Sequence, residues 1–285
     1  DAAVAFVKDL SVLGQVDVAA AYISSTLDQV TVEDARLDFQ RDVWDRLHAI
    51  LGDAPALSGM PVKIHVRGAQ GHPAHELLLL AKEQRNGLIV IGTHRRSAWR
   101  QMLKASFPNT IAVHAETNVL CVPGTFHAPT AQVPAIHRAL VATDFSDCGN
   151  DAIRHAYSLV GPGGEVRLLH VCFSPSPGFD MAIASEAFLD HTVAMAQSLK
   201  DADARLTALI PRVLATTGVT TTAEILPHHD IAAGICEAAD RFGADVICMG
   251  TTGHSRARIA LLGSTVQAVL AHSHRPVFVV TLPQA

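Results

Sequence analysis

The sequence lacks the features that mark several large classes of proteins. It has no run of about twenty predominantly apolar residues, the length that a membrane-spanning helix needs. No basic start followed by an apolar segment and a small-residue cleavage site is visible, so we expect no secretory signal peptide. Charged residues make up only 17% of the chain and hydrophobic residues 49%, a balance that excludes an intrinsically disordered protein.

Cysteine is also scarce, and its pattern carries no disulfide or redox motif. The five cysteines are odd in number and form no CxxC. Most of them lie inside apolar runs such as DVICMG and NVLCVPG, where a thiol is a small core side chain. We therefore expect reduced core cysteines in a cytoplasmic protein.

The chain also lacks a large excess of either positive or negative residues. The formal net charge of −5 comes from 22 basic and 27 acidic residues that form no long runs. Such a distribution gives no electrostatic footprint for nucleic acid or for an anionic membrane. A small molecule or another protein is the expected partner.

The common catalytic and metal motifs are absent too. The sequence has no GxSxG elbow, no GxxxxGK[ST] loop, no HExxH and no zinc-type Cys/His spacing. The closely spaced histidine pairs, His228 with His229 and His272 with His274, lack the further ligands that a metal site needs. We expect no catalytic residue, no metal site and no enzyme activity.

What the chain does contain is a repeat. Residues 92–123 align without gaps on residues 250–281, which places Gly92 on Gly250 and Ser106 on Ser264. Residues 1–23 match residues 151–173. Two copies of one domain in tandem are therefore predicted.

The second copy alternates short apolar runs with amphipathic segments. The apolar runs predict strands at 138–145, 165–173, 220–226, 244–250 and 276–281, and the segments between them predict helices at 147–161, 188–218, 231–243 and 261–273. This alternation is typical of a parallel sheet with helices on both faces. The predicted fold class is α/β, with two tandem doubly wound domains.

The domain boundaries follow from the same alignment. We expect a first domain at 1–125, a proline-containing linker at 126–137 and a second domain at 138–285. The first copy lacks a counterpart of residues 138–150, which hold the first strand and the loop after it. A sheet without that strand has two open edges, so we expect a further segment ahead of Asp1.

A glycine-rich loop follows the predicted strand at 244–250. Gly250 and Gly253 are separated by two residues, and Gly263 follows nine residues later, directly ahead of Ser264 and Thr265. Glycines let the backbone approach an anion, and N–H groups at the start of a following helix can point at phosphate oxygens. Ligands of open parallel sheets bind at such carboxyl ends of strands.

The loop closely resembles the nucleotide-binding signature of the universal stress protein family. The segments ALVATDFSDCGNDAIRHA and RPVFVVT resemble the opening and closing segments of that family's domain. The resemblance covers residues 136–282 and, in weaker form, residues 1–123. It implies the universal-stress-protein-like, adenine nucleotide alpha hydrolase-like fold, a bound ATP, ADP or AMP with Mg²⁺ on the nucleotide, a homodimer and a regulatory role in the stress response.

The resemblance also implies the roles of single residues. Asp144 would accept from a ribose hydroxyl or orient the base, Val171 would contact adenine through its backbone, and Met249 would pack near the nucleoside. The full set of implied nucleotide-binding residues is Ala142, Thr143, Asp144, Val171, Met249, Gly250, Gly253, His254, Gly263, Ser264 and Thr265. For Asp144, capping the next helix is the alternative.

The first copy departs from the pattern at the phosphate loop. Gly253 is matched by Arg95 and Gly263 by Ala105, so side chains stand where the backbone should approach phosphate. We therefore expect the second domain to hold the nucleotide and the first to be a structural partner. Two alternatives stay open: a nucleotide-independent dimeric interaction module, and a slow ATPase.

Overall fold

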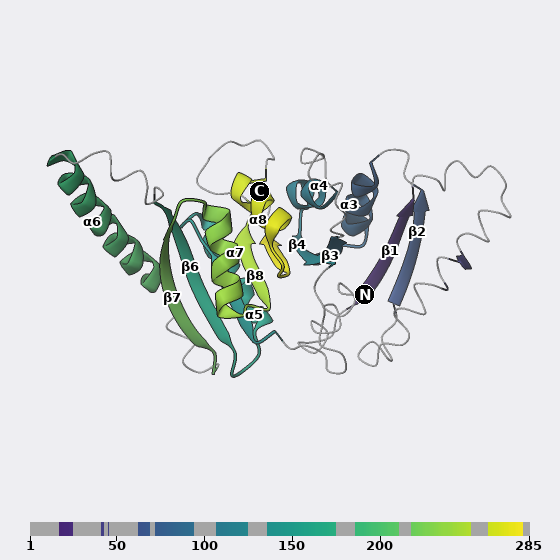
Figure 1. Cartoon of the computed structure of the whole chain (residues 1–285). Coiled ribbons are helices and arrows are strands. Elements are labelled where there is room, and N and C mark those ends of the chain that lie inside the picture. Colours follow the sequence, from purple (N-terminus) through teal and green to yellow (C-terminus); the bar gives the residue numbers. More distant parts are fainter. Residues whose placement is uncertain are drawn as a thin grey trace. The chain divides into compact units, whose positions relative to one another are not determined.

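The computed structural model describes residues 17–24, 41–42, 45, 62–68, 72–93, 107–124, 136–174, 186–210, 218–251 and 262–281 (Figure 1). The chain divides into two compact units. Unit 1 comprises residues 1–134 with 283–285, and unit 2 comprises residues 135–282. Most of the predicted linker, residues 126–135, lies outside the described residues.

The described residues of unit 2 form five parallel strands in the order β9-β8-β5-β6-β7. Its elements are, in chain order, β5 (Arg138–Ala142), α5 (Asp147–Leu159), β6 (Glu165–Phe173), α6 (Glu186–Ala208), β7 (Thr220–His228), α7 (Ile231–Phe242), β8 (Val246–Gly250), α8 (Ser264–His272) and β9 (Val277–Val280). After β5 the chain runs outward through β6 and β7, then returns to the other side of β5 for β8 and β9. The predicted doubly wound α/β fold is therefore confirmed.

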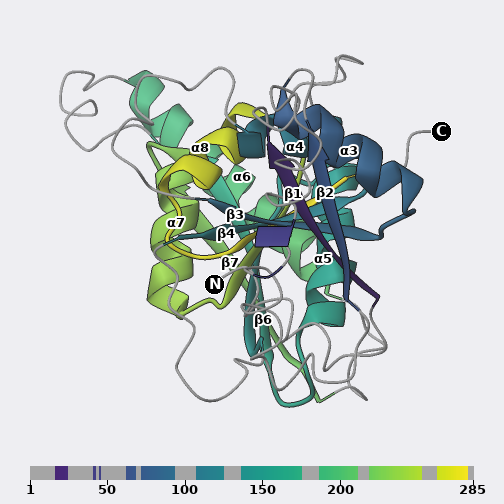
Figure 2. The same ribbon diagram turned by 90° about the vertical axis from the view of Figure 1, so that its right-hand side faces the viewer.

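Helices cover both faces of this sheet. Figures 1 and 2 show α5 and α7 on opposite sides of it. The alternation of side chains along β6 agrees with this placement. Arg167 of β6 stacks its guanidinium carbon 4.2 Å from the ring centre of Phe242 in α7. His170, three residues further along, lies instead against Phe145 in the loop that precedes α5.

The core of unit 2 lies where the central strands are sandwiched. Ala139, Leu140 and Val141 of β5 are completely buried, as are Val246 and Ile247 of β8. Strands covered on both faces need continuous apolar runs, which explains why the sequence shows such runs instead of alternation.

All five cysteines are free, as the sequence predicted for reduced core thiols. Cys121, Cys148 and Cys248 are buried, whereas Cys172 and Cys236 are partly buried. Burial disfavours the thiolate, and it raises the pKa of Cys121 to about 12. Such thiols are weak nucleophiles at neutral pH.

Several predicted boundaries differ from the structure, among them the end of the strand expected at 138–145, which lies at Ala142. The helix expected at 188–218 ends at Ala208, and Leu209 and Ile210 are already outside it. The proline that follows Ile210 disfavours helical backbone at the residue before it and removes a helical donor. Strand β7 continues through Pro227 to His228, which is compatible with its place at the end of the strand order, because an edge position needs no second partner.

Unit 1 repeats most of these elements. Its described strands and helices are β1 (Val18–Ser24), β2 (Val62–Gly68), α3 (Pro73–Glu83), β3 (Leu88–Thr93), α4 (Phe107–His114) and β4 (Asn118–Pro123). β1 pairs in parallel with β2, and β3 pairs in parallel with β4. Arg67 of β2 hydrogen-bonds Glu83 of α3 and thereby holds the pKa of that carboxyl below its usual value.

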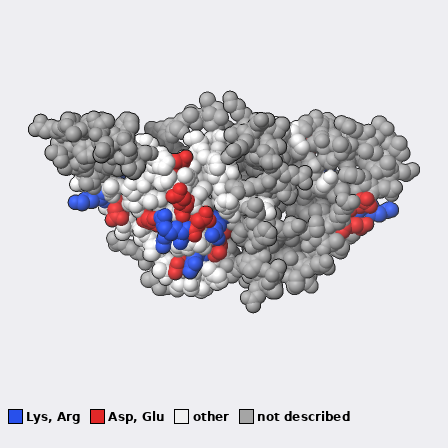
Figure 3. Space-filling view, viewed as in Figure 1, with Lys and Arg blue, Asp and Glu red and all other residues white. Residues whose placement is uncertain are grey.

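Charged side chains of both signs gather over α7 and the neighbouring strands of unit 2 (Figure 3). Glu224 of β7 contacts Arg167 at 3.2 Å and Arg241 at 2.6 Å, and Asp240 contacts Arg275 at 3.0 Å. Because the two signs neutralise each other, this face offers no basic surface for nucleic acid. No helix in the described ranges is long and apolar enough to cross a membrane.

Candidate functional site

The candidate site lies in unit 2, where β5 and β8 run side by side. β5 pairs with β6 on one edge and with β8 on the other, and the chain changes direction across the sheet between these two pairings. Loops after neighbouring strands diverge at such a reversal and leave a crevice at their carboxyl ends. Thr143 follows β5 at this end of the sheet, and Met249 and Gly250 end β8.

The loop after β5 is held by its own hydrogen bonds. Asp144 is exposed, and its Oδ1 accepts from the N–H of Ser146 at 3.1 Å and from the hydroxyl of Ser146 at 2.5 Å. Ser146 in turn caps α5, because its Oγ accepts from the N–H of Gly149 at 3.1 Å. The alternative role considered for Asp144, capping the next helix, is therefore wrong: Ser146 is the cap and Asp144 orients it.

Phe145 adopts a backbone conformation that is rare for a residue with a side chain, with φ of 67°. Its N–H donates to the hydroxyl of Thr143 at 3.0 Å, and its carbonyl accepts from the side chain of Asn150 at 3.4 Å. Its ring lies 4.4 Å from the ring of His170 and 4.2 Å from the guanidinium carbon of Arg205. These contacts from β6, α5 and α6 fix the shape of the loop. No sequence motif indicated a role for Phe145 or Arg205.

His170 is bound within the structure. Its Nδ1 lies 2.8 Å from the carbonyl oxygen of Thr143, and because that oxygen can only accept, Nδ1 carries the proton. The buried hydroxyl of Thr143 donates to the side-chain oxygen of Asn150 at 3.0 Å. The hydroxyl proton of Thr143 is thus already hydrogen-bonded within the protein and is not available to a ligand.

Val171 is placed so that its backbone faces the crevice. The last pair between β5 and β6 joins Ala142 to Leu169, and the N–H of Thr143 donates to the carbonyl of Leu169 at 3.0 Å. In a strand the backbone groups of residues two apart point to the same side. The N–H and C=O of Val171 therefore point toward the edge at which β5 has already ended, while its side chain lies buried against α7.

Gly250 is required by packing. A Cβ at this position would lie 2.7 Å from the carbonyl carbon of Cys148 and 2.8 Å from the backbone nitrogen of Gly149. The thiol of Cys148 also donates to the carbonyl of Val280 at 3.2 Å. The first turn of α5 thus presses directly on the end of β8, and only glycine fits between them.

Gly263 has a different environment. Its N–H donates to the carbonyl of Thr251 at 2.9 Å, so the two described ends of the loop meet. A Cβ here would lie 3.4 Å from that same oxygen and 3.8 Å from Val266, which are ordinary contacts. No crowding within the described residues demands glycine at this position.

Gly263 is the N-cap of α8, and α8 begins without a side-chain cap. Four helices have their N-cap among the described residues, and the other three are capped by His72, Ser146 and Asp230. At α7 the N–H of Ala233 donates to Asp230 and keeps the pKa of that carboxyl below its usual value. The first N–H groups of a helix have no acceptor inside it, so those of Ser264 and Thr265 depend on a partner outside α8.

The structure brings together most of the predicted residues. Ala142, Thr143, Asp144, Val171, Met249, Gly250, Gly263, Ser264 and Thr265 come from the carboxyl ends of β5, β6 and β8 and the start of α8. Gly253 and His254 lie outside the described residues, as do Arg95 and Ala105 of unit 1. In the part of the chain that the structure describes, no group of three or more His, Cys, Asp or Glu side chains could hold a metal ion.

Comparison with known proteins identifies the family. The model of the universal stress protein family matches residues 1–123 and again residues 135–281. The chain belongs to the universal stress protein family. The two matched segments make it a tandem member with two such domains, as the internal repeat predicted.

Individual relatives of the family agree with this assignment. A universal stress protein of Methanocaldococcus jannaschii is 29% identical over 152 residues, which are 52% of this chain and 83% of that protein. The crystal structure of a universal stress protein from Archaeoglobus fulgidus matches with a TM-score of 0.64 at 19% identity, covering 97% of this chain and 92% of the other. A putative universal stress protein from Pseudomonas aeruginosa matches with a TM-score of 0.54 at 14% identity, covering 92% of each chain. Both structural matches show the fold alone.

Proposed function

We propose that unit 2 binds an adenine nucleotide, ATP or its products ADP and AMP, at the carboxyl ends of β5 and β8. Occupancy of this site would regulate contacts with a partner in a stress response, and the protein would act by binding, without a catalytic residue. The phosphates would lie at the start of α8 and the nucleoside would lie over the ends of β5 and β6.

The start of α8 carries this proposal. Its first N–H groups lack a side-chain cap, although the chain caps α3, α5 and α7 with side chains. The partial positive charge of a helix N-terminus favours an anion, and the hydroxyls of Ser264 and Thr265 add donors there. A phosphate group would supply the missing acceptors.

The other end of the site suits a nucleoside. The backbone N–H and C=O of Val171 can pair with the polar edge of a base, as a neighbouring strand would. Asp144 is exposed and can accept from a ribose hydroxyl, while Met249 offers a buried apolar contact. The rigid loop through Phe145 keeps these groups in place before a ligand arrives, which reduces the ordering cost of binding.

The proposal is tested by copying the natural difference between the repeats. Gly253→Arg introduces the residue that unit 1 has at Arg95 and would fill the phosphate position. We expect the affinity for ATP, measured by calorimetry on the full chain, to fall at least about a hundredfold, which is about 2.8 kcal/mol. Mass spectrometry of the freshly purified protein should also find a bound adenine nucleotide in the wild type.

Gly161→Arg is the matched control. Gly161 precedes β6, at the opposite end of the sheet from the proposed site, and a Cβ there meets nothing within 4 Å. This variant should bind ATP with wild-type affinity. Wild-type affinity in Gly253→Arg would instead show that the phosphates do not bind at this loop.

Self-association as a homodimer remains part of the proposal, and light scattering with and without ATP measures it.

A further inference from the structure

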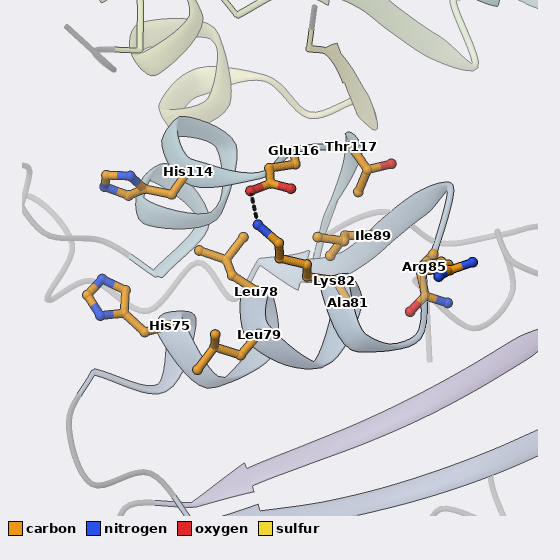
Figure 4. Close-up of a pocket in the computed structure, with 11 residues that line it drawn as sticks. His75, Leu78, Leu79, Ala81, Lys82, Arg85, Ile89, His114, Glu116 and Thr117 are labelled. Carbon is orange, nitrogen blue, oxygen red and sulfur yellow. Dashed lines mark hydrogen bonds and ion pairs between the residues drawn. The ribbon is translucent and has the colours of Figure 1, made fainter. Parts of the chain in front are cut away.

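Unit 1 carries a groove between α3 and the segment that joins α4 to β4 (Figure 4). Its volume is about 840 Å³, within the range of about 300–1,000 Å³ that is usual for small-molecule sites. Ile89, at the start of β3, is buried beneath it. The groove therefore lies at the amino ends of β3 and β4, whereas the nucleotide site of unit 2 is proposed at the carboxyl ends of strands.

The wall that α3 contributes is apolar and accessible. Leu78 and Leu79 line the groove together with the stem of Lys82, and Leu79 is 53% exposed. From His75 to Lys82 this wall runs for about 10 Å along the helix. An exposed leucine beside a hollow of this size can be covered by the apolar part of a ligand.

The equivalent surface of unit 2 has different residues, although α7 aligns with α3 without gaps. Leu78 is replaced by Cys236 and Leu79 by Glu237, and the position of His75 is taken by Ala233. The apolar wall is therefore specific to unit 1. The fold does not require it, because α7 forms the same helix with a charged residue at that position.

Among the described residues that line the groove, Arg85 is a cation without an ion-pair partner. Lys82 spans the groove to Glu116 at 2.7 Å, as Figure 4 shows, and so neutralises the carboxylate in the lining. Arg85 lines one end and has no ion pair with another described residue. His75 and His114 lie at the other end, with ring centres 6.2 Å apart. The lining thus combines an apolar wall with an unmatched guanidinium.

We propose that this groove binds small anionic amphiphiles, molecules with an apolar body and a single carboxylate or sulfonate group, such as medium-chain fatty acids. The apolar body lies along Leu78 and Leu79 over Ile89, and the anionic group pairs with Arg85. This site is independent of the nucleotide site, since every residue that forms it belongs to unit 1.

The test uses 8-anilinonaphthalene-1-sulfonate as a fluorescent probe and decanoate as its competitor, with the full chain. We expect one displaceable probe molecule per chain. Leu79→Glu copies unit 2 and should weaken probe and decanoate binding about tenfold, since it places a carboxylate in the apolar wall. Arg85→Gly also copies unit 2, at Gly243, and should weaken binding about threefold, because an exposed ion pair contributes little.

Both variants should fold normally. Leu79 is exposed, and Arg85 has a φ of 53°, which glycine adopts without strain. Phe173→Glu is the control, since Phe173 is the most exposed of the large apolar side chains described and lies in unit 2. This variant should bind the probe as the wild type does. Probe binding that survives Leu79→Glu, or that is lost in Phe173→Glu, would overturn the proposal. Decanol competing as well as decanoate would overturn the requirement for an anion.

Discussion

At the scale of single residues, the glycines of the loop in unit 2 have distinct reasons to be glycine. Gly250 is fixed by the approach of α5, because a Cβ would collide with backbone atoms of Cys148 and Gly149. Gly263 has room for a side chain and yet leaves α8 without a cap. Of these two glycines, only Gly263 therefore indicates a ligand.

This difference can be tested by capping α8 with a side chain. In Gly263→Asp the carboxylate can accept from the first N–H groups of the helix, as Asp230 does at α7. We expect the free energy of unfolding, measured with urea, to stay the same or to rise by about 0.5 kcal/mol. ATP affinity should fall at least about tenfold, because the new carboxylate competes with phosphate for the same donors and repels it.

Gly263→Ser is the uncharged comparison, since serine also caps helices but does not repel phosphate. It should retain more of the ATP affinity than Gly263→Asp. A Gly263→Asp variant that binds ATP like the wild type would show that the start of α8 is not the phosphate site.

At the scale of elements, the described residues of unit 1 form two pairs of strands. Within those residues β1 pairs only with β2, and β3 pairs only with β4. In unit 2 the counterparts of these pairs, β6-β7 and β8-β9, are joined by β5 between them. Helix α3 packs against β1 as α7 packs against β6, the strand that lies next to β5 in unit 2.

A strand supplied at the position equivalent to β5 should join the two pairs. Residues 136–150 hold β5 and the start of α5, and Asp1 aligns with Asp151, so a second copy of residues 136–150 fused to Asp1 continues the repeat without a break. Pairing with a new strand satisfies the open backbone groups at the strand edges. We therefore expect amide exchange in β1 and β3 to slow at least about tenfold, which corresponds to about 1.4 kcal/mol in the free energy of opening.

The same fifteen residues in scrambled order, again fused to Asp1, are the control for chain length and composition. The scrambled fusion should leave exchange in β1 and β3 unchanged. Equal protection in the two fusions would mean that unit 1 has no place for a fifth strand.

At the scale of the whole molecule, the two repeats share a fold but differ in chemistry. Unit 2 keeps every glycine of the loop, whereas unit 1 has Arg95 and Ala105 at two of the matching positions. Unit 1 in turn has an apolar groove wall where unit 2 has Glu237. The two copies thus differ in sequence at both proposed sites, with nucleotide proposed for one and an anionic amphiphile for the other.

This asymmetry predicts one bound ATP per chain at saturation. Arg95, Arg96 and other basic residues of unit 1 could attract a second nucleotide by charge alone, but such attraction is screened over about 8 Å at physiological ionic strength. Calorimetry at low and high salt separates the two cases. A stoichiometry of one at both salt concentrations is expected, and a stoichiometry of two that persists at high salt would contradict it.

The fold could be predicted from the sequence because it depends on local patterns, and the candidate site was inferred from the same patterns. Apolar runs such as the one at 244–250 have to be buried strands, and their alternation with amphipathic segments leaves the doubly wound sheet as the solution. The internal repeat then gave the tandem arrangement, and the glycine loop located the carboxyl ends of the strands at which the predicted residues meet. The end of α6 was misjudged although Pro211, a local signal, was present.

Other features were decided only by the tertiary structure, because they depend on neighbours distant in the sequence. The approach of α5 to Gly250, the stacking of Arg205 on Phe145 and the end of the β5–β6 pairing ahead of Val171 each depend on residues from different elements. The groove of unit 1 likewise appears only when α3 packs beside the start of β4. Side-chain identity fixes what a residue can do, but the fold decides which partners are within reach.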